Sequence, residues 1–517
     1  MIDLKSYIQG EWRVGSADWA TLVNPSTEES VARTSTAGFA FGEMVSFART
    51  YGQPALAAMT FRERGEMLRA LSKAIHAHRD ELLGLGIQNG GNTRSDAKFD
   101  VDGASGTLMA YADLGVSLGD RTTLVDGEAI QLGRSARLFG QHIYSSRPGV
   151  AVHINAFNFP AWGTAEKAAC ALLAGMPVIS KPATSTALVA FRLAEICVAS
   201  GALPKGAFTF VAGGTGDLFS HLGGQDVLAF TGSSKTGAML RGVPAVVEHG
   251  LRLNVEADSL NAAVLGHDVE IGGDTFQLFL ADVVRDMTQK TGQKCTAIRR
   301  IYVPKDKCPE VLEAIKERLS SVTVGDPSRD DVQMGPVATA NQFRDVRAGI
   351  ENFAKSAKVM FGASDAKPFA GQVGSKGFFV SPTLFFSESP SPTDPMHQHE
   401  VFGPVAVVMA YDGTGASAAK WIAAGGGGLV ASVYSDDKDF LRAVVLGSAA
   451  FNGRLTIGSA KIAGQAIPPG TVLPSLVHGG PGRAGGGEEL GGVRGLAFYM
   501  QRTALQGDRP ILELFSK

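Results

Sequence analysis

The stretch Val150-Ala151-Val152-His153-Ile154 decides how the chain folds, and the turn Asn158-Phe159-Pro160 follows it closely. Its apolar pattern predicts a buried strand. Helical and extended patterns then follow one another in units of roughly 25 to 30 residues, a rhythm typical of a parallel sheet covered by helices. We expect further strands over 177–180, 208–211 and 227–230, with helices over 164–174 and 185–200.

A second series of the same kind begins after Leu253-Asn254-Val255-Glu256-Ala257, which is itself typical of a buried strand. Ahead of both series, residues 58–85 carry apolar side chains at helical spacing and predict one long amphipathic helix. With 517 residues the chain can form more than one core, so we predict an α/β fold with two or more domains. Strands of the second series are expected over 263–265, 300–303, 405–408 and 429–433.

The composition is that of a globular enzyme. Hydrophobic residues make up 44% of the chain and charged residues 19%, and the net charge is −2. This balance gives no electrostatic reason to expect binding to nucleic acid or to an anionic membrane. The sequence has neither an apolar run of about 18 residues nor a basic-then-apolar N-terminal region, so we expect a cytoplasmic protein without a membrane span.

Cysteines and histidines give little sign of a metal. The four cysteines lie far apart and form no CxxC pair, which argues against a structural zinc site or a disulfide framework. His397 and His399 stand two residues apart in a loop, and such a pair alone is weak evidence for a ligand set. We therefore predict no metal. The cysteines are Cys170, Cys197, Cys295 and Cys308.

One cysteine and one glutamate are candidates for catalysis. Cys295 lies in the glycine-broken segment Thr291-Gly292-Gln293-Lys294-Cys295-Thr296, just beyond a predicted helix, where a thiol can reach a bound molecule. Glu256 lies 39 positions upstream in an otherwise apolar strand, where a carboxylate is costly unless it has a partner or a task. Together they predict covalent catalysis by a thiol with a separate general base.

Several further segments share a single resemblance. In order and spacing they resemble the aldehyde dehydrogenase superfamily, and the resemblance runs from Asn24-Pro25-Ser26-Thr27 to about Gln501, nearly the whole chain. Agreement of so many separated segments by chance is negligible. The segments are Asn155-Ala156-Phe157-Asn158-Phe159-Pro160-Ala161-Trp162, Ser180-Lys181-Pro182-Ala183, Phe230-Thr231-Gly232-Ser233, Gly377-Phe378-Phe379-Val380-Ser381-Pro382-Thr383 and Glu400-Val401-Phe402-Gly403-Pro404.

The resemblance implies an aldehyde dehydrogenase-like α/β fold. It consists of two open parallel-sheet (Rossmann-like) domains and a small β element for bridging and oligomerisation. The cofactor-binding domain is expected over 1–131 and 148–256, and the catalytic domain over 257–495. The bridging element would take 132–147 and 496–510, and it implies a homodimer or a dimer of dimers.

The same resemblance implies a role for each catalytic residue. Cys295 would be the nucleophile, and the Asn158 amide with the Cys295 backbone N–H would stabilise the oxyanion. Glu256 would activate water against the thioester, and family members that pass the acyl group to free coenzyme A generally lack this glutamate, so release of an acid is expected. Lys294 could lower the thiol pKa if it points inward; a surface position is the open alternative.

Lys181 and Thr184 indicate which cofactor is used. The resemblance implies that Lys181 contacts the adenine-side ribose, and NAD-preferring members often carry a glutamate at the position of Thr184. Without that carboxylate a 2′-phosphate is not repelled, so NADP is expected and NAD is less favoured. A buried structural role is the alternative for Phe402. The other residues implied to bind the cofactor are Phe157, Gly214, Gly232, Ser233, Glu400 and Phe402.

The C-terminal segment Leu476–Gly492 is the most specific part of the resemblance. It is similar to dehydrogenases of aerobic phenylacetate and benzoate degradation that act on CoA-linked semialdehydes. The phenylacetate proteins continue into a hydratase domain, for which few residues remain here, so the benzoate group is favoured. This implies 3,4-dehydroadipyl-CoA semialdehyde as the substrate. His478 and Arg483 are candidate substrate residues, with a histidine bonded to loop backbone and a plain loop arginine as alternatives.

Other functions remain as alternatives. The chain could act on small free aldehydes, or in the phenylacetate pathway beside a separate hydratase, with the same catalytic residues. A protein that has kept the fold without turnover would be expected to lose Asn158, Glu256 or Cys295, and all three are present. A cysteine-dependent esterase would not need the cofactor residues.

Overall fold

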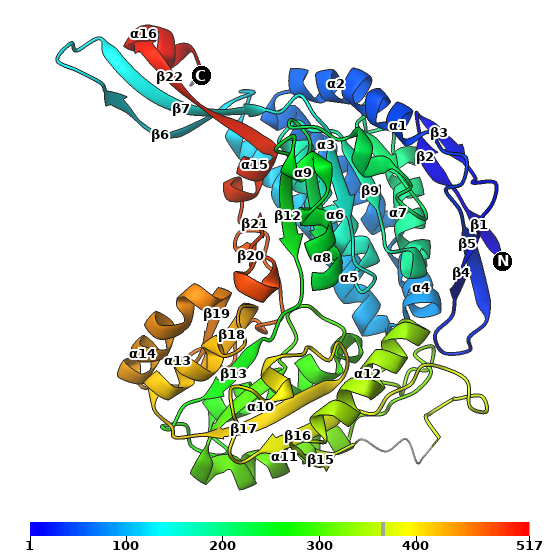
Figure 1. Ribbon diagram of the computed structural model, residues 1–517, viewed down its shortest axis with the longest axis vertical. Coiled ribbons are helices and arrows are strands. Elements are labelled where there is room, and N and C mark those ends of the chain that lie inside the picture. The colour runs from blue at the N-terminus through cyan, green and yellow to red at the C-terminus, as the bar shows by residue number, and fades with distance from the viewer. Residues whose placement is uncertain (363–367, 516–517) are drawn as a thin grey trace.

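Two seven-stranded sheets form the body of the computed structural model, which describes residues 1–362 and 368–515 (Figure 1). The first has the order β12-β11-β8-β9-β10-β2-β3, and its first five strands are parallel, as the sequence predicted. The edge strands β2 (Ser6–Ile8) and β3 (Glu11–Arg13) are antiparallel. The parallel strands are β8 Ala151–Ile154, β9 Val178–Lys181, β10 Phe208–Phe210, β11 Val227–Thr231 and β12 Arg252–Glu256.

Helices cover this sheet, and one of them differs from the prediction. The single helix predicted over 58–85 is wrong, because the chain forms α3 (Phe61–Ala77) and α4 (Arg79–Gly90) with a break at His78. His78 has φ −106° and ψ 19°, outside the helical region, and its ring contacts the carbonyl of Ala74. The other helices of this part include α1 Phe41–Phe47, α2 Gln53–Ala58, α5 Arg94–Leu118, α6 Pro160–Leu173, α7 Ala187–Ala199, α8 Ser234–Arg241 and α9 Pro244–Val247.

The second sheet has the order β15-β16-β17-β14-β13-β18-β19 and is covered by helices on both faces. On β13 the side chain of Val264 joins one apolar cluster, whereas Ala263 and Leu265 join the cluster on the other face, as alternation along a strand requires. The strands are β13 Ala262–Leu265, β14 Arg300–Pro304, β15 Lys358–Phe361, β16 Thr383–Ser387, β17 Val405–Tyr411, β18 Gly428–Tyr434 and β19 Asn452–Gly458. The helices are α10 Asp274–Thr288, α11 Cys308–Ser320, α12 Ala340–Phe353, α13 Gly415–Ala423 and α14 Lys438–Ser448.

A three-stranded sheet projects from the body at the upper left of Figure 1. Its order is β22-β7-β6, with β7 at Leu138–Ser146 and β22 at Met500–Asp508. The hairpin begins earlier than expected, because β6 (Leu124–Gln131) pairs with β7 instead of belonging to the cofactor-binding part. Most of β6 is exposed, so its sequence lacks the apolar stripe that would have marked it as a strand. Oligomer formation through this sheet stays a prediction.

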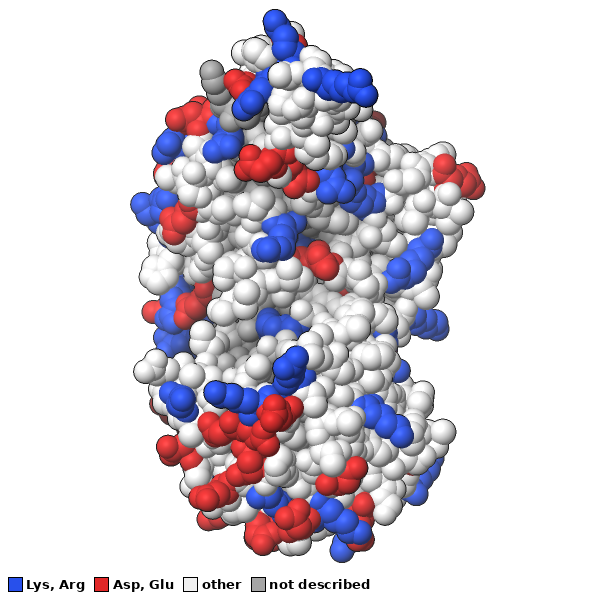
Figure 2. Space-filling model, turned by 90° about the vertical axis from the view of Figure 1, so that its left-hand side faces the viewer, with Lys and Arg blue, Asp and Glu red and all other residues white. Residues whose placement is uncertain are grey.

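The remaining elements lie at the two ends of the chain. A small sheet near the N-terminus, which the sequence did not predict, has the order β1-β5-β4. None of the helices in the described residues combines the length and the apolar composition that a membrane span needs. On the face drawn in Figure 2, basic side chains are interspersed with acidic ones and form no continuous basic surface. These elements are β1 Ile2–Leu4, β4 Ala20–Val23, β5 Ser30–Thr34, β20 Val477–Gly479, β21 Glu488–Leu490, α15 Val493–Tyr499 and α16 Arg509–Leu512.

Candidate active site

A cleft of about 490 Å³ lies where the chain passes from β12 of the first sheet into β13 of the second. Segments that follow β8, β9, β11 and β12 form one wall, since the carboxyl ends of parallel strands meet at the same edge. Loops of the second sheet form the other wall. All the predicted catalytic and cofactor residues except Gly214 line it: Phe157, Asn158, Lys181, Thr184, Gly232, Ser233, Glu256, Cys295, Glu400 and Phe402.

A left-handed turn positions Cys295 in this cleft. Lys290, Thr291 and Gly292 have φ values of 53°, 56° and 68°, so the chain reverses sharply after α10. The hydroxyl of Thr291 donates to the carbonyl of Gly335 at 2.9 Å and anchors the turn. A Cβ on Gly292 would lie 2.2 Å from the carbonyl oxygen of Gly403. Glycine is therefore required at 292 both by the backbone angle and by the contact.

Replacing Gly292 with alanine is expected to lower the thermal unfolding midpoint and the rate at which Cys295 is alkylated. The left-handed angle alone costs about 1–3 kcal/mol, and the contact with Gly403 adds to it. Gly426→Ala is the matched control, because Gly426 has φ 69° and no atom within 4 Å of the added Cβ. Equal destabilisation of the two variants, measured by thermal unfolding, would contradict the role of the Gly403 contact.

Hydrogen bonds hold the Cys295 loop against Asn158. The Asn158 Nδ2 donates to the carbonyl of Gln293 at 3.0 Å, and its side chain is 9% exposed. Asn261 Nδ2 donates to the carbonyl of Cys295 at 2.8 Å. The backbone N–H of Cys295 has no acceptor among the described residues. Two N–H donors, one from each of Asn158 and Cys295, can therefore be offered to a bound oxygen.

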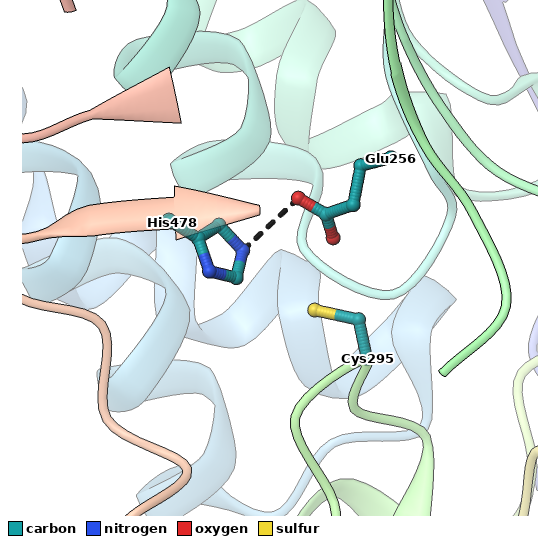
Figure 3. Close-up of side chains that lie close together, drawn as sticks. All are labelled: Glu256, Cys295 and His478. Carbon is teal, nitrogen blue, oxygen red and sulfur yellow. Dashed lines mark ion pairs between the residues drawn. The ribbon is translucent and has the colours of Figure 1, made fainter. Parts of the chain in front are cut away.

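Glu256, Cys295 and His478 point toward one another from three separate segments (Figure 3). Glu256 ends β12, Cys295 follows the turn after α10, and His478 lies on β20. One ligand atom of each lies within 4.8 Å of the other two. His478 Nε2 and Glu256 Oε2 lie 3.0 Å apart. The sequence had offered a substrate tunnel or a loop backbone as the surroundings of His478, and it did not anticipate this contact.

The protonation states of the thiol and the carboxyl depend on each other. Burial raises the pKa of the Cys295 thiol well above its ordinary value, and the neighbouring Glu256 carboxylate raises it further. Burial also opposes ionisation of Glu256, but the interaction with His478, helped by Lys167, outweighs burial and lowers the pKa of this carboxyl. The resting site therefore holds a protonated thiol beside an ionised carboxylate.

A second group of buried charges adjoins Glu256. Lys167 Nζ lies 2.7 Å from Glu166 Oε1 and 3.2 Å from Glu489 Oε2, and all three side chains are buried. Burial raises the pKa of the Glu166 carboxyl. Sequence reasoning missed these residues. The signal was present, because Glu166 and Lys167 are a charged pair inside the otherwise apolar helix α6.

Lys294 takes neither of the two positions considered for it. The side chain is buried, so the surface alternative is wrong. Its Nζ donates to Asp286 Oδ1 at 2.6 Å and to Gln289 Oε1 at 2.9 Å, and the ion pair with Asp286 neutralises it. Lys294 does not lower the pKa of the Cys295 thiol, which is raised.

Lys181 and Thr184 lie together at the part of the cleft that follows β9. Burial lowers the pKa of the Lys181 ammonium to about 8, and no acidic side chain of the described residues pairs with it. The Thr184 hydroxyl is within 3.4 Å of the carbonyl of Gly213. Gly214, expected to bind the cofactor, is not among the residues that line the cleft, and its carbonyl accepts from Thr36 Oγ1 at 3.2 Å.

The N-terminus of α8 faces the same cleft. Ser233 is its N-cap and accepts from the backbone N–H of Thr236, and both residues line the cleft with Gly232. A helix N-terminus carries free N–H groups and a partial positive charge, which suit a phosphate. These are the properties needed to hold a pyrophosphate.

Glu400 and Phe402 enter the cleft from the second sheet. Burial raises the pKa of Glu400 to about 7, although Arg299 at 3.3 Å and the backbone N–H of Ser259 at 3.0 Å oppose this shift. Phe402 packs edge-on against Phe157, with ring centroids 5.8 Å apart. The two residues thus present a carboxyl group and an aromatic edge to a ligand in the cleft.

Arg483 lies away from this cleft. Its Nη2 donates to the carbonyl of Gln398 at 2.8 Å, and it is not among the residues that line the cleft. Of the two histidines considered as ligands, His397 is buried against Trp421 and contacts Arg300, whereas His399 is exposed. These contacts hold Arg483 against the segment of Gln398, and His397 against α13 and β14.

Comparison with known proteins gives one consistent result. The model of the aldehyde dehydrogenase family matches residues 12–505. A 3,4-dehydroadipyl-CoA semialdehyde dehydrogenase of Aromatoleum evansii is 41% identical over 479 residues, which cover 92% of this chain and 93% of that protein. Among solved structures, betaine aldehyde dehydrogenase of Staphylococcus aureus in complex with NAD⁺ has a TM-score of 0.83 and 23% identity, covering 98% of this chain and 95% of that one. A 3,6-anhydro-L-galactose dehydrogenase in complex with NADP has the same TM-score and 22% identity, covering 98% and 100%.

Proposed function

Because the chain belongs to the aldehyde dehydrogenase family, we propose that it oxidises 3,4-dehydroadipyl-CoA semialdehyde to the CoA-linked acid with NADP. The proposed reaction type rests on one observation, that Asn158, Glu256 and Cys295 line the same cleft. The observation that carries the substrate is the 41% identity, over 92% of the chain, to the enzyme named for this semialdehyde.

In the first step Cys295 Sγ bonds to the aldehyde carbon. The thiol must lose its proton, and Glu256 is the ionised acceptor beside it. The carbonyl oxygen gains negative charge as the bond forms. The Asn158 amide and the Cys295 backbone N–H are the donors for this oxygen, and such donors are worth most in a site from which water is excluded.

The nicotinamide cofactor, when bound, supplies the acceptor for the hydride that the adduct loses on becoming a thioester. The residues available to hold it fit that group. The N-terminus of α8 offers N–H groups to the pyrophosphate, and Glu400 and Phe402 offer a carboxyl group and a ring edge to the nicotinamide riboside. The chain's task in this step is to hold the adduct and the cofactor in the same cleft.

Glu256 then releases the thiol proton to solvent and, ionised again, takes a proton from water as the water oxygen bonds to the thioester carbon. The carbon–sulfur bond breaks, the acid leaves, and the proton returns to the Cys295 sulfur. The lowered pKa of Glu256 keeps this base ionised near neutral pH. A carboxylate beside the thiol therefore supports release of an acid over transfer of the acyl group to free coenzyme A.

The environment of Lys181 supports NADP over NAD. Lys181 is half-buried in the cleft without an acidic partner among the described residues, so a 2′-phosphate would supply the missing anion. Thr184 contributes a hydroxyl in place of a carboxylate that would repel a phosphate. Charge-assisted hydrogen bonds of this kind are worth about 1.5–3 kcal/mol.

Replacing Lys181 with methionine is expected to lower kcat/KM for NADP by about 10- to 100-fold, the range that losing one charge-assisted hydrogen bond allows. The value for NAD should change much less, because NAD has no 2′-phosphate. Thr184→Glu should shift the preference further toward NAD. Steady-state rates with each cofactor measure both effects, and an equal loss with NAD and NADP would contradict the assignment.

The same lysine predicts a pH dependence. Its pKa of about 8 means that Lys181 is charged below that pH and neutral above it. The advantage of NADP over NAD should therefore be full at pH 7 and decline as the pH rises through about 8. The ratio of kcat/KM for the two cofactors, measured from pH 6.5 to 9.5, removes effects common to both. A ratio that is constant with pH would contradict this prediction.

The substrate proposal is tested by initial rates of NADPH formation with 3,4-dehydroadipyl-CoA semialdehyde beside a free aldehyde of similar length. A large advantage in kcat/KM for the CoA-linked compound is expected. Equal rates, or a preference for the free aldehyde, would overturn the substrate and leave the roles of Cys295 and Glu256 standing.

A further inference from the structure

The three side chains drawn in Figure 3 also form a set of metal ligands. Glu256, Cys295 and His478 each offer one ligand atom within 4.8 Å of the other two, and in the described residues no other group of three His, Cys, Asp or Glu does so. Glu256 is 2% exposed and His478 is 1% exposed. This group differs from an exposed acidic cluster because two of its side chains are buried and because it combines a carboxyl group, a thiol and an imidazole.

Two of the three ligand atoms form an ion pair without a well-aligned hydrogen bond. Glu256 Oε2 and His478 Nε2 lie 3.0 Å apart, yet neither has a well-aligned hydrogen bond within the described residues. Buried polar atoms without a well-aligned hydrogen bond are costly, so a ligand bonded to both atoms would satisfy them better than their ion pair does. Their separation suits a cation bonded to both atoms, because ligand bonds of about 2.0–2.2 Å place neighbouring ligands of a tetrahedral ion a little over 3 Å apart.

The chemistry of the donors selects the metal. One imidazole nitrogen, one thiolate sulfur and one carboxylate oxygen are the ligands that Zn²⁺ takes, and three protein ligands with an open fourth position are typical of it. Mg²⁺ and Ca²⁺ need six or more oxygen ligands, which this group does not offer.

We propose that Glu256, Cys295 and His478 bind one zinc ion that reversibly inhibits the enzyme. On binding, the Cys295 sulfur gives up its proton to solvent and bonds to zinc as a thiolate, without any change of oxidation state. The ion then occupies both the sulfur that attacks the aldehyde and the carboxylate that activates water. Inhibition rests on the proposed function, whereas zinc binding does not.

The test uses the full chain, freed of metal by dialysis against a chelator that is then removed. Calorimetric titration with zinc should give about one ion per subunit, and the same zinc concentrations should abolish NADPH formation until a chelator is added. Cobalt(II) should bind in its place and give the near-ultraviolet absorption of a cobalt–thiolate bond. Mg²⁺ and Ca²⁺ at equal concentration should have no effect. Absence of zinc binding, or of the thiolate absorption, would overturn the proposal.

Variants assign the ligands. His478→Phe keeps a ring of similar size against Trp162. It should weaken zinc binding by at least about 100-fold, because losing a residue that only hydrogen-bonds to a metal ligand already costs up to about 100-fold in affinity. Cys295→Ala and Glu256→Gln should do the same. Cys308→Ser and His399→Ala are matched controls at residues outside this group and should bind zinc like the unaltered protein. Unchanged binding by Cys295→Ala or His478→Phe would overturn the site.

The calorimetric readout separates this proposal from the substrate assignment. Zinc binding is measured without aldehyde or cofactor, so failure of the CoA-linked substrate leaves the result unchanged. Variants that lose binding are checked by thermal unfolding, and the cobalt spectrum of the unaltered protein decides the matter if a variant does not fold.

Discussion

Replacing Cys295 with alanine should lower kcat/KM for the aldehyde by about 10⁴-fold or more, comparable with the loss of other catalytic nucleophiles. The thiol is the group of the cleft that can bond to the aldehyde carbon and later leave from a thioester. Without it, neither the adduct nor the hydride donor forms. Initial rates of NADPH formation at saturating cofactor measure the loss.

Cys308→Ser is the matched control for this experiment. Cys308 is buried like most of the Cys295 loop, but it lies at the start of α11 and lines no part of the cleft. Its replacement should leave the rate nearly unchanged. Binding of NADPH to Cys295→Ala, followed by fluorescence, shows whether the cleft is intact. A Cys295→Ala variant that retains a tenth of the normal rate or more would exclude Cys295 as the nucleophile.

Replacing Glu256 with glutamine should lower steady-state kcat by about 10²- to 10⁴-fold, the range assigned to general acid–base catalysis. The amide keeps the shape of the side chain but cannot take a proton from water. Thioester formation should continue at a reduced rate. Removing the carboxylate also removes one of the two main causes that raise the pKa of the Cys295 thiol, so the thiol ionises more readily. A rapid-mixing experiment should therefore show NADPH formed up to about one equivalent per subunit, followed by a very slow phase.

Hydroxylamine provides the control for the Glu256 variant. As a strong external nucleophile it should release the acyl group from Cys295 and restart NADPH formation without any base from the protein. The unaltered enzyme should gain little from it, because water already does this step. Normal steady-state turnover by Glu256→Gln, or failure of hydroxylamine to accelerate it, would contradict the role of Glu256 in thioester hydrolysis.

The sequence by itself determined the central parallel strands of both large sheets and the residues at their carboxyl ends, but not the strands β2, β3, β15, β16 and β19. Strands β8, β9 and β11 are short apolar runs bounded by turn residues, so local pattern was enough to find them. Parallel order then brings the residues that follow these strands to one edge, which is why Asn158 and Lys181 share a cleft. Their chemical roles stay predictions.

Local pattern failed where a segment carries no local signal. Most of strand β6 is exposed and the strand is held by pairing with β7, so alternation of apolar residues could not reveal it. The break at His78 interrupts a helical pattern that continues on both sides of it. Gly214 was expected beside the cofactor, and its position next to Thr36 depends on the packing of the N-terminal strands.

Only the tertiary structure decided the electrostatics of the site. Lys294 forms an ion pair with Asp286, and His478 forms one with Glu256, and the two members of each pair come from different segments of the chain. A side chain's charge and hydrogen bonding depend on which groups surround it after folding, and no periodicity of the sequence encodes that. The sequence determined which residues reach the cleft. Contacts between distant segments decided that the thiol is protonated, that the carboxylate beside it is ionised, and that His478 lies next to both. The reason is that burial and neighbouring charges, which set these states, arise only when the chain has folded.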